Sequence, residues 1–219
     1  MTPTDLLANV PLFDDLTPSE LEELAKASEV QDLRRGDVVF REGDEPDCLY
    51  VVVEGRIAIA NRSSDGRESV VALMEHGDLF GEMGLFERLG RSAEARALEP
   101  SQVVVIAYEP IRRIYEQRPE LLWGVVELLA GRLRNMDLAL ADSVFLDVTG
   151  RTAKRLLEMA GGQEEFTLPV TQEELAAMVG ASRERVNKAI ASFVRLGWIA
   201  QADRRYRITD REQLERRAR

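Results

Sequence analysis

The sequence has very little of the two residue types that most often form disulfides or hold transition metals. It contains one cysteine, Cys48, and one histidine, His76, in 219 residues. A single cysteine excludes a disulfide within the chain, and two such residues are too few for the usual zinc, haem or iron–sulfur ligand sets. We therefore expect no metal, no haem and no iron–sulfur cluster. We expect Cys48 to be a packing residue in a reducing, cytoplasmic compartment.

Long apolar runs are also absent. No stretch approaches the roughly 20 apolar residues that a membrane-spanning helix needs. The opening, MTPTDLLANVPLFDD, lacks the basic start and apolar core of a secretion signal. With 45% hydrophobic and 31% charged residues, the composition is typical of a soluble globular protein, and no membrane partner is expected.

Basic residues are outnumbered, with 29 Lys and Arg against 39 Asp and Glu and a net charge of −10. The imbalance is confined to the front of the chain. Residues 1–144 carry 15 basic and 28 acidic side chains, a net of −13, whereas residues 145–219 carry 14 and 11, a net of +3. An acidic front and a mildly basic back predict two domains with different partners, so the total charge does not exclude DNA.

Short β-branched runs dominate residues 28–108, after a helical opening in which Thr17, Pro18 and Glu20 form the start of a helix. The runs are DVVF, CLYVVV, RIAIAN, SVVALM and SQVVVIAY, and glycines separate them. Their spacing leaves no room for crossover helices, so an all-β barrel or roll of about eight strands is predicted. Because helices precede and follow these strands, the fold class is α+β.

A long helix is predicted over about residues 117–143. Its apolar residues recur at alternating steps of four and three, the spacing of a heptad seam. The stripe consists of Leu122, Val126, Leu129, Leu133, Met136 and Leu140. It either packs on its own domain or pairs with a second copy in a parallel dimer, and its regularity favours the dimer. FLDVTGR, residues 145–151, then breaks the stripe, and Asp147 is predicted to cap the next helix at a hinge between domains.

Residues 171–199, TQEELAAMVGASRERVNKAIASFVRLGWI, predict a helix-turn-helix. Thr171 and Glu174 form a capping box, Gly180 permits the tight turn, and Ser182 caps the second helix. The buried faces of the two helices are predicted to be Leu175, Met178 and Val179, and Val186, Ile190 and Phe193. WIAQADRRYRIT, which follows, predicts a two-stranded wing, so the domain is predicted to be a winged helix.

The second helix of this motif carries polar residues in its first two turns, where a recognition helix reaches base edges in the major groove. They are Arg183, Glu184, Asn187 and Lys188. An arginine can donate twice to guanine, and a carboxylate can accept from cytosine. Arg204 and Arg205 at the wing tip suit backbone phosphates. The alternative interpretation is a solvated charged face.

Residues 77–97, GDLFGEMGLFERLGRSAEARA, combine an anion site with a carboxylate. Gly81 permits a turn into a short helix that starts near Glu82 and presents free N–H groups. Arg91 offers a planar donor fork for phosphate, Ser92 adds a hydroxyl, and Glu82 can accept from a sugar hydroxyl. Phosphate and ribose together indicate a nucleotide. Taken alone, the two pairs are equally compatible with a surface ion pair.

We call residues 77–97 the cassette. In this order, the β-roll, the cassette, the heptad helix, the hinge and the winged helix resemble the CRP/FNR superfamily of bacterial transcription regulators over essentially the whole chain. The motifs that carry the resemblance are FGEMGLFERLGRSAEARA, FLDVTGR and GASRERVNKAI. It implies a cyclic-nucleotide-binding β-roll with its dimerisation helix over residues 1–144 and a DNA-binding domain over residues 145–219.

The resemblance also assigns roles to individual residues. Ligand contacts fall on Gly81, Glu82, Met83, Arg91, Ser92 and Arg132, with Glu82 on the 2′-hydroxyl and Arg91 and Ser92 on the cyclic phosphate. Base readers fall on Arg183, Glu184 and Lys188, which implies half-sites similar to TGTGA, read more loosely at Lys188 because lysine lacks the arginine fork. The two positions that meet the purine in cyclic-AMP-responsive members, where those have Thr and Ser, are here Met136 and Asp137. A carboxylate there accepts from adenine's amine and suits guanine's two donors at least as well.

We therefore expect a cytoplasmic, homodimeric transcription regulator that binds palindromic DNA and is controlled by cyclic AMP. A regulator controlled by cyclic GMP or a cyclic dinucleotide, or one that binds DNA constitutively, is the main alternative. RNA polymerase is an expected partner, although GGQEEFTLPV, residues 161–170, is shorter than the family loop that touches it. No metal-ligand cluster or nucleophile–base pair supports a cyclic-nucleotide-processing enzyme, so we expect no enzymatic activity.

Overall fold

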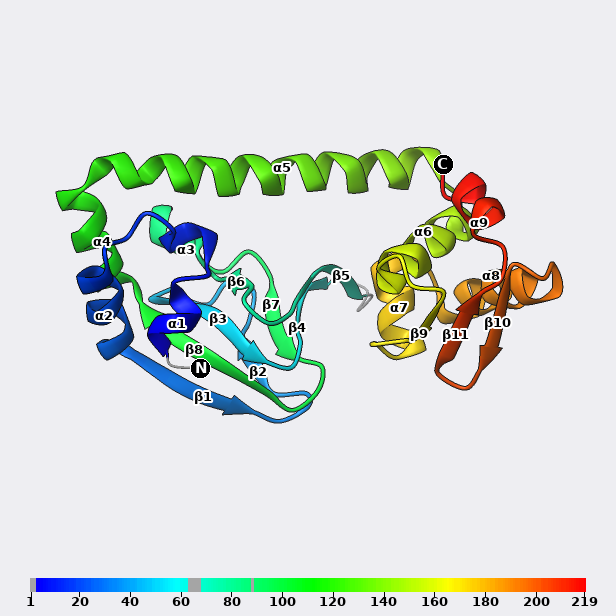
Figure 1. Ribbon diagram of the computed structural model, residues 1–219, viewed down its shortest axis with the longest axis horizontal. Coiled ribbons are helices and arrows are strands. Elements are labelled where there is room, and N and C mark those ends of the chain that lie inside the picture. Colours follow the sequence, from blue (N-terminus) through cyan, green and yellow to red (C-terminus); the bar gives the residue numbers. More distant parts are fainter. Residues whose placement is uncertain (1–2, 63–67, 88) are drawn as a thin grey trace. The chain divides into compact units, whose positions relative to one another are not determined.

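The computed structural model describes residues 3–62, 68–87 and 89–219 (Figure 1). The chain divides into two compact units, Met1–Arg67 with Val71–Leu133, and Glu68–Val70 with Arg134–Arg219. The first contains the predicted β-roll and the second the predicted winged helix, so the α+β fold class is confirmed. No helix in the described ranges is long and apolar enough to cross a membrane.

The chain opens with the helices α1 (Pro3–Leu7), η1 (Pro11–Phe13) and α2 (Pro18–Lys26). The capping box predicted for α2 is present. The Thr17 hydroxyl accepts from the N–H of Glu20 at 3.3 Å, and the Glu20 carboxylate accepts from the N–H of Thr17 at 2.7 Å. The inner face of α2 buries Leu21 and Leu24, which places the helix against the core of the first unit.

Eight strands form the roll over the described part of residues 28–107. They are β1 (Ser28–Leu33), β2 (Val38–Phe40), β3 (Cys48–Glu54), β4 (Ile57–Arg62), β5 (Glu68–Met74), β6 (Leu79–Phe80), β7 (Glu94–Ala97) and β8 (Ser101–Ala107). They form two sheets with the orders β1-β8-β3-β6 and β2-β7-β4-β5. In the first sheet β8 pairs antiparallel with β3, and Val51 lies opposite Val104. Aromatic and β-branched side chains of both sheets, among them Phe40, Ile57 and Phe80, fill the space between them.

A single-turn helix, α3 (Met83–Phe86), follows β6, and Glu82 is its N-cap residue. Gly81 forms the turn with φ of +79°, a conformation that side chains rarely adopt. A Cβ atom there would also lie 2.8 Å from Nη1 of Arg91. The predicted short helix is confirmed, and glycine is needed at 81 both for the turn and for the approach of Arg91.

The long helix begins later than predicted. Helix α4 (Tyr108–Gln117) ends first, a 3-10 turn η2 (Pro119–Leu121) follows, and α5 runs over Leu122–Phe145. Arg118 leaves the helical region with φ of −131° and ψ of 73°. The start predicted at about 117 is therefore wrong, because the ring of Pro119 disfavours helical geometry in the residue before it.

The second unit contains α6 (Val148–Ala160), β9 (Glu165–Thr167), α7 (Gln172–Val179), α8 (Arg183–Arg195), β10 (Ile199–Ala202), β11 (Arg205–Ile208) and α9 (Arg211–Arg217). Helices α7 and α8 are the predicted helix-turn-helix, and β10 and β11 are the wing (Figure 1). Thr171, Ser182 and Asp147 cap α7, α8 and α6, as predicted. Gly180 ends α7 with φ of +67°, which confirms its role in the turn.

Candidate functional site

Arg91 is the centre of a buried polar cluster in the first unit. It is 7% exposed, and its guanidinium lies 4.2 Å from the centre of the Phe40 ring. Nη1 donates to the carbonyl of Gly81 at 2.7 Å and to the hydroxyl of Tyr108 at 2.9 Å. Nη2 donates to the carbonyl of Cys48 at 2.7 Å. Arg91 and Gly81, which lie ten residues apart and were predicted to bind the same ligand, are therefore in direct contact.

The groups that accept hydrogen bonds from the Arg91 guanidinium are neutral. Burial raises the pKa of Tyr108 to about 12, although the positive charge of Arg91 acts in the opposite direction. Burial likewise raises the pKa of the Cys48 thiol, which is the buried packing residue that the sequence predicts. Both groups keep their protons at neutral pH, so the Tyr108 hydroxyl donates to the carbonyl of Gly81 while it accepts from Arg91.

Glu82 and Arg132, also predicted to serve one ligand, form an ion pair. Glu82 is 1% exposed, and one of its oxygens, Oε1, accepts from Nη1 of Arg132 on α5. Nη2 of the same arginine donates to the carbonyl of Leu79 at 2.7 Å. Arg132 is half-buried, with 34% of its side chain exposed. The first turns of α5 are thus tied to the cassette through a buried carboxylate.

Two buried atoms of this cluster have no hydrogen-bond partner among the described residues. They are Oε2 of Glu82, an acceptor, and Nε of Arg91, a donor. Leaving a buried polar group unpaired costs about 1–3 kcal/mol, so native proteins seldom do it without a reason. A ligand that brings one hydroxyl donor and one anionic acceptor would satisfy both atoms.

The remaining predicted ligand residues are exposed. Ser92 and Met83 lie next to each other at the cassette, with 3.7 Å between Oγ and Sδ. Met136 and Asp137 are exposed on α5, within the second compact unit. Their role at the purine stays a prediction.

The apolar stripe of α5 is exposed in the single chain. Its members Leu122, Val126, Leu129, Leu133, Met136 and Leu140 are between 40% and 67% exposed. The only residue of α5 that is fully buried is Val125, which is outside the stripe. The interpretation in which the stripe packs on its own domain is therefore wrong for the described chain. An apolar seam of this size left open to water is typical of a surface that pairs with another molecule.

Helix α8, the predicted recognition helix, presents exposed charge. Arg183, Glu184 and Lys188 are exposed, and Nζ of Lys188 lies 2.7 Å from Oε1 of Glu184. Lys188 holds the pKa of the Glu184 carboxyl below its ordinary value, through a hydrogen bond and its charge. Asn187 is half-buried, and its Oδ1 has no partner among the described residues.

The inner faces of the helix-turn-helix agree with the prediction except at one position. Val186, Ile190 and Phe193 of α8 are buried, and so are Leu175 and Val179 of α7. Met178 is only partly buried, and Ala176 is fully buried instead. The hydroxyl oxygens of Thr171 and Ser182 accept hydrogen bonds from the main-chain N–H groups at the starts of their helices. Any contact of these two residues with DNA would come in addition to capping.

The wing tip does not present its two arginines alike. Arg204 lies in the turn beside Asp203, whose φ is +54°, and donates from Nη2 to the carbonyl of Leu168 at 3.0 Å. Arg205 begins β11 and is exposed. Both side chains are exposed, and the contact of these two arginines with backbone phosphates stays a prediction.

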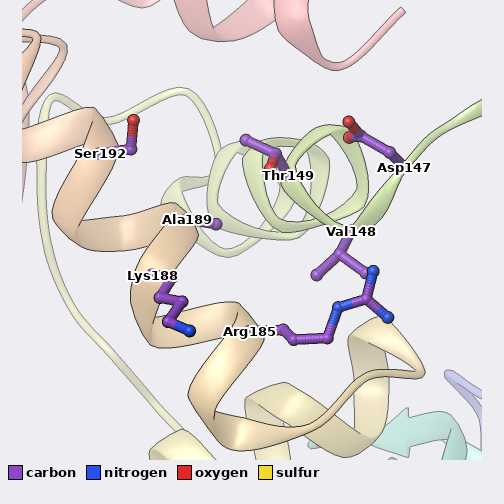
Figure 2. Close-up of a pocket in the computed structure, with 7 residues that line it drawn as sticks. All are labelled: Asp147, Val148, Thr149, Arg185, Lys188, Ala189 and Ser192. Carbon is purple, nitrogen blue, oxygen red and sulfur yellow. The ribbon is translucent and has the colours of Figure 1, made fainter.

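A groove of about 250 Å³ separates the start of α6 from α8 (Figure 2). Arg185 extends from α8 toward Val148, and Lys188 lies on the same helix one turn further along (Figure 2). The lining is completed by Asp147, Thr149, Ala189 and Ser192. The groove thus combines two cations and two hydroxyls with one carboxylate, so its lining is largely polar.

The hinge segment is tied to the helix-turn-helix by one arginine. Arg151 donates from Nη1 to the carbonyl of Leu146 at 2.7 Å and from Nε to the carbonyl of Val179 at 2.8 Å. Asp147 accepts from the N–H of Gly150 at 2.8 Å, and this contact helps to hold the pKa of its carboxyl below the ordinary value. Arg151 therefore connects the main chain of the hinge to the end of α7, so a movement of one would act on the other.

Sequence reasoning missed the partners of Arg91, namely Phe40, Cys48 and Tyr108. The two hydrogen-bonding partners are 43 and 17 residues away along the chain, and neither lies in a recognisable motif. Only the pairing of β3 and β8 brings them together. No group of three or more His, Cys, Asp or Glu in the described ranges could hold a metal ion.

Two families match this chain in separate segments. Residues 30–118 match the cyclic nucleotide-binding domain, and residues 150–217 match the Crp-like helix-turn-helix domain. The first segment contains the Arg91 and Glu82 cluster, and the second contains α8 and the wing. The matches thus fall on the two candidate sites that the geometry indicates.

Curated relatives match along most of the chain. One from Mycobacterium tuberculosis, a CRP-like cAMP-activated global transcriptional regulator, is 39% identical over 98% of this chain and 99% of its own length. The cAMP-activated global transcriptional regulator Vfr of Pseudomonas aeruginosa is 35% identical over 72% of this chain and 78% of its own.

Two solved structures are similar as well. The Thermus thermophilus catabolite activator protein is 29% identical, covers 95% of this chain and 98% of its own, and gives a TM-score of 0.54. The c-di-GMP responsive global regulator CLP of Xanthomonas campestris is 25% identical, covers 88% of this chain and 99% of its own, and gives a TM-score of 0.76.

Proposed function

Because this chain belongs to the CRP/FNR superfamily of DNA-binding transcription regulators with a cyclic-nucleotide-binding domain, we propose that it acts as a homodimer whose affinity for DNA is set by cyclic AMP. The observation that carries the proposal is the pair of buried, unpartnered atoms in the cassette, Oε2 of Glu82 and Nε of Arg91. A cyclic nucleotide brings a ribose hydroxyl for the first and a phosphate for the second.

The phosphate subsite is complementary to a single negative charge. Arg91 supplies a charged donor, and hydrogen bonds from charged donors are shorter and stronger than those between neutral groups. Met83 and the exposed hydroxyl of Ser92 border the same surface. The short helix α3 that begins after Glu82 leaves main-chain N–H groups without helical partners. These groups together favour the cyclic phosphate over a neutral ligand.

The ribose subsite is Glu82, whose remaining oxygen can accept from the 2′-hydroxyl. Arg132 orients the carboxylate through its hydrogen bond to Oε1. A ligand on Glu82 would therefore also be linked to α5 through Arg132. That link supports coupling between the nucleotide site and the dimerisation helix.

The purine is expected to meet α5 at Met136 and Asp137. Met136 follows Arg132 by four residues and so lies on the same side of the helix, one turn further along. Relatives at 39% and 35% identity are named cAMP-activated, which supports cyclic AMP as the effector. The carboxylate of Asp137 suits the two donors of guanine equally well, and the c-di-GMP responsive CLP keeps guanine ligands as the second candidate.

The exposed stripe of α5 supports a parallel dimer, in which two copies of α8 would enter successive major grooves about 34 Å apart. Arg183, Glu184, Asn187 and Lys188 would read bases in half-sites similar to TGTGA, and Arg204 and Arg205 would contact phosphates. Thr171 and Ser182, at the starts of their helices, complete the proposed surface. The groove beside α8, with Arg185 and Lys188, would add contacts to the DNA backbone.

The functional division of the chain is proposed at residue 145, where α5 ends at Phe145 and Asp147 caps α6. Ligand would change the pairing of α5 and the hinge, and it would affect DNA only as far as it prefers the DNA-competent state. We place the protein in the cytoplasm, with RNA polymerase as a partner and without an enzymatic activity. Incubating cyclic AMP with the protein and measuring AMP tests the last point, since any turnover would contradict it.

Calorimetric titration of cyclic AMP and cyclic GMP tests the proposed effector site. Glu82→Gln keeps the shape of the side chain but removes its charge, and it should weaken binding about 10- to 100-fold, the range for hydrogen bonds to charged groups. Glu87→Gln, at a half-buried position that ends α3, is the matched control and should bind as the wild type does. Wild-type protein that binds neither nucleotide would refute the proposed site.

A further inference from the structure

Helix α4 packs behind the phosphate cassette and places a buried tyrosine hydroxyl between its two halves. Tyr108, the first residue of α4, is 2% exposed. Its hydroxyl donates to the carbonyl of Gly81 and accepts from Nη1 of Arg91, which itself donates to the same carbonyl. The carbonyl of Gly81, just after β6, the guanidinium of Arg91, just before β7, and the hydroxyl of Tyr108 on α4 thus form a closed triangle of hydrogen bonds.

This triangle fixes which donors of Arg91 remain for a ligand. A guanidinium has five N–H donors in a rigid plane. Three of them are directed at oxygen atoms of the protein, namely Gly81 O, Tyr108 Oη and Cys48 O. Nε has no partner among the described residues, and the further N–H of Nη2 has only the Cys48 sulfur, a weak acceptor, at 3.8 Å. Two donors are what bidentate recognition of a phosphate requires.

Of the strong hydrogen-bond partners of Arg91, Tyr108 is the only side chain, since the others are main-chain carbonyls. The Phe40 ring, with its centre 4.2 Å away, limits tilting of the guanidinium plane but does not prevent its rotation within that plane. The hydroxyl of Tyr108 restrains that rotation together with the carbonyls of Gly81 and Cys48, and it is the part of the restraint that a side-chain substitution can remove. Its position relative to Arg91 therefore contributes to the direction in which the two remaining donors point.

A second residue of α4 holds the other wall of the cassette. Nη2 of Arg112 donates to the carbonyl of Leu85 at 3.3 Å, and the guanidinium lies 5.6 Å from the centre of the Tyr108 ring. Helix α3 approaches Tyr108 so closely that a Cβ on Gly84 would lie 2.9 Å from the tyrosine oxygen. Arg112 thus connects the end of α3 to the ring that orients Arg91.

We propose that Tyr108 and Arg112 are positioning residues for the cyclic phosphate: Tyr108 orients the free donors of Arg91, and Arg112 fixes α3 and the Tyr108 ring. This inference rests on the proposed function, because it presupposes that Arg91 binds the phosphate. It adds that the selectivity of the site for one phosphate oxygen over the other is set from α4, the helix that leads through η2 into α5.

Removing only the Tyr108 hydroxyl tests the first half. Tyr108→Phe should weaken the binding of cyclic AMP and of cyclic GMP by the same factor, about tenfold, because the phosphate is common to both. The Rp and Sp phosphorothioate analogues of cyclic AMP replace one exocyclic oxygen at a time. Their affinity ratio should move toward one in Tyr108→Phe, a change that a purely structural role would not produce.

Tyr115→Phe is the matched control. Tyr115 lies on the same helix, is equally buried, and donates its hydroxyl to the carbonyl of Leu12 at 3.0 Å, away from the cassette. The Tyr115→Phe variant should lose about as much thermal stability as Tyr108→Phe does. It should keep the wild-type affinity for the nucleotide and the wild-type affinity ratio of the two analogues. A Tyr108→Phe protein whose affinity and analogue ratio both equal those of Tyr115→Phe would overturn the assignment of Tyr108.

Arg112→Gln tests the second half and decides the question if Tyr108→Phe folds poorly. Arg112 is exposed, so its replacement should be tolerated, and Arg113→Gln on the neighbouring exposed position is the control. Arg112→Gln should weaken the cyclic nucleotide about threefold and shift the analogue ratio in the same direction, whereas Arg113→Gln should do neither. If Arg112→Gln also matches its control, the inference fails. Wild-type protein that binds no cyclic nucleotide would refute the proposed function instead, so the two failures are distinguishable.

Discussion

The cassette and the recognition helix both rely on charged side chains, but they keep them in opposite environments. Glu82 and Arg91 are 1% and 7% exposed and are held by the protein on several sides. Glu184 and Lys188 pair with each other while 76% and 74% of their side chains are exposed. Buried charges are costly unless they are fully paired, whereas exposed pairs contribute little to stability. A change in the cassette should therefore remove binding, and a change on α8 should alter selectivity.

The strongest way to break the comparison is to remove the buried cation. Arg91→Leu should weaken the cyclic nucleotide at least 100-fold, because it deletes the charge that faces the phosphate. Calorimetry measures the loss, and sedimentation should show that the dimer persists. Arg91→Lys, which keeps the charge but lacks the planar fork, should bind the nucleotide with an affinity between those of the wild type and Arg91→Leu. Equal affinity in wild type and Arg91→Leu would refute the phosphate assignment.

Selectivity on α8 provides the next largest effect. Glu184→Ala should reduce discrimination at one base pair in each half-site by about 1–3 kcal/mol, the usual contribution of one good base contact. Binding to duplexes that carry every base at that position measures it. Glu173→Ala on α7, another exposed acidic residue, should leave the profile unchanged. An equal loss of affinity on all sequences would instead identify Glu184 as a folding residue.

The purine preference is expected to change less than either of these. Asp137→Ala should alter the ratio of cyclic AMP to cyclic GMP affinity by roughly tenfold or less, since one exposed carboxylate is removed. Calorimetry of both nucleotides on both proteins gives the ratio. If the ratio is the same in wild type and variant, Asp137 does not meet the base.

The smallest effect concerns the exposed pair itself. Lys188 lowers the pKa of the Glu184 carboxyl, so Lys188→Ala should let that pKa rise toward its ordinary value of 4.5. The shift should shrink in high salt even in the wild type, because exposed charges are screened. Carboxyl carbon NMR across a pH titration measures it. A pKa unaffected by Lys188→Ala would show that the pair does not persist in solution.

Local signals in the sequence were sufficient for most of the fold. The capping residues Thr17, Asp147, Thr171 and Ser182 are all confirmed, because a cap depends on side chains within a few residues of each other. The heptad spacing of α5 predicted a dimer seam; its apolar residues are exposed in the single chain, and their pairing with a second copy stays a prediction. The start of α5 was missed because Pro119 ends the preceding helix, and periodicity alone does not register a short break.

The candidate site was predictable only in part, because its contacts are not local. Glu82 and Arg91 could be found from their residue types and from Gly81 beside them. The Tyr108 hydroxyl could not, since it reaches the cassette only when β8 and α4 are in place. The position of Arg132 came from resemblance alone, and its ion pair with Glu82 became visible only in three dimensions.

DNA binding with and without the effector tests the central claim most directly. A fluorescent palindromic duplex with TGTGA half-sites one helical turn apart would be titrated at fixed salt, by anisotropy, in the absence and presence of saturating cyclic AMP. Coupling of this kind is typically about 5- to 150-fold. We predict that cyclic AMP tightens binding within that range and that the gain disappears in Arg91→Leu. Equal affinity with and without a nucleotide that calorimetry shows to be bound would contradict the account.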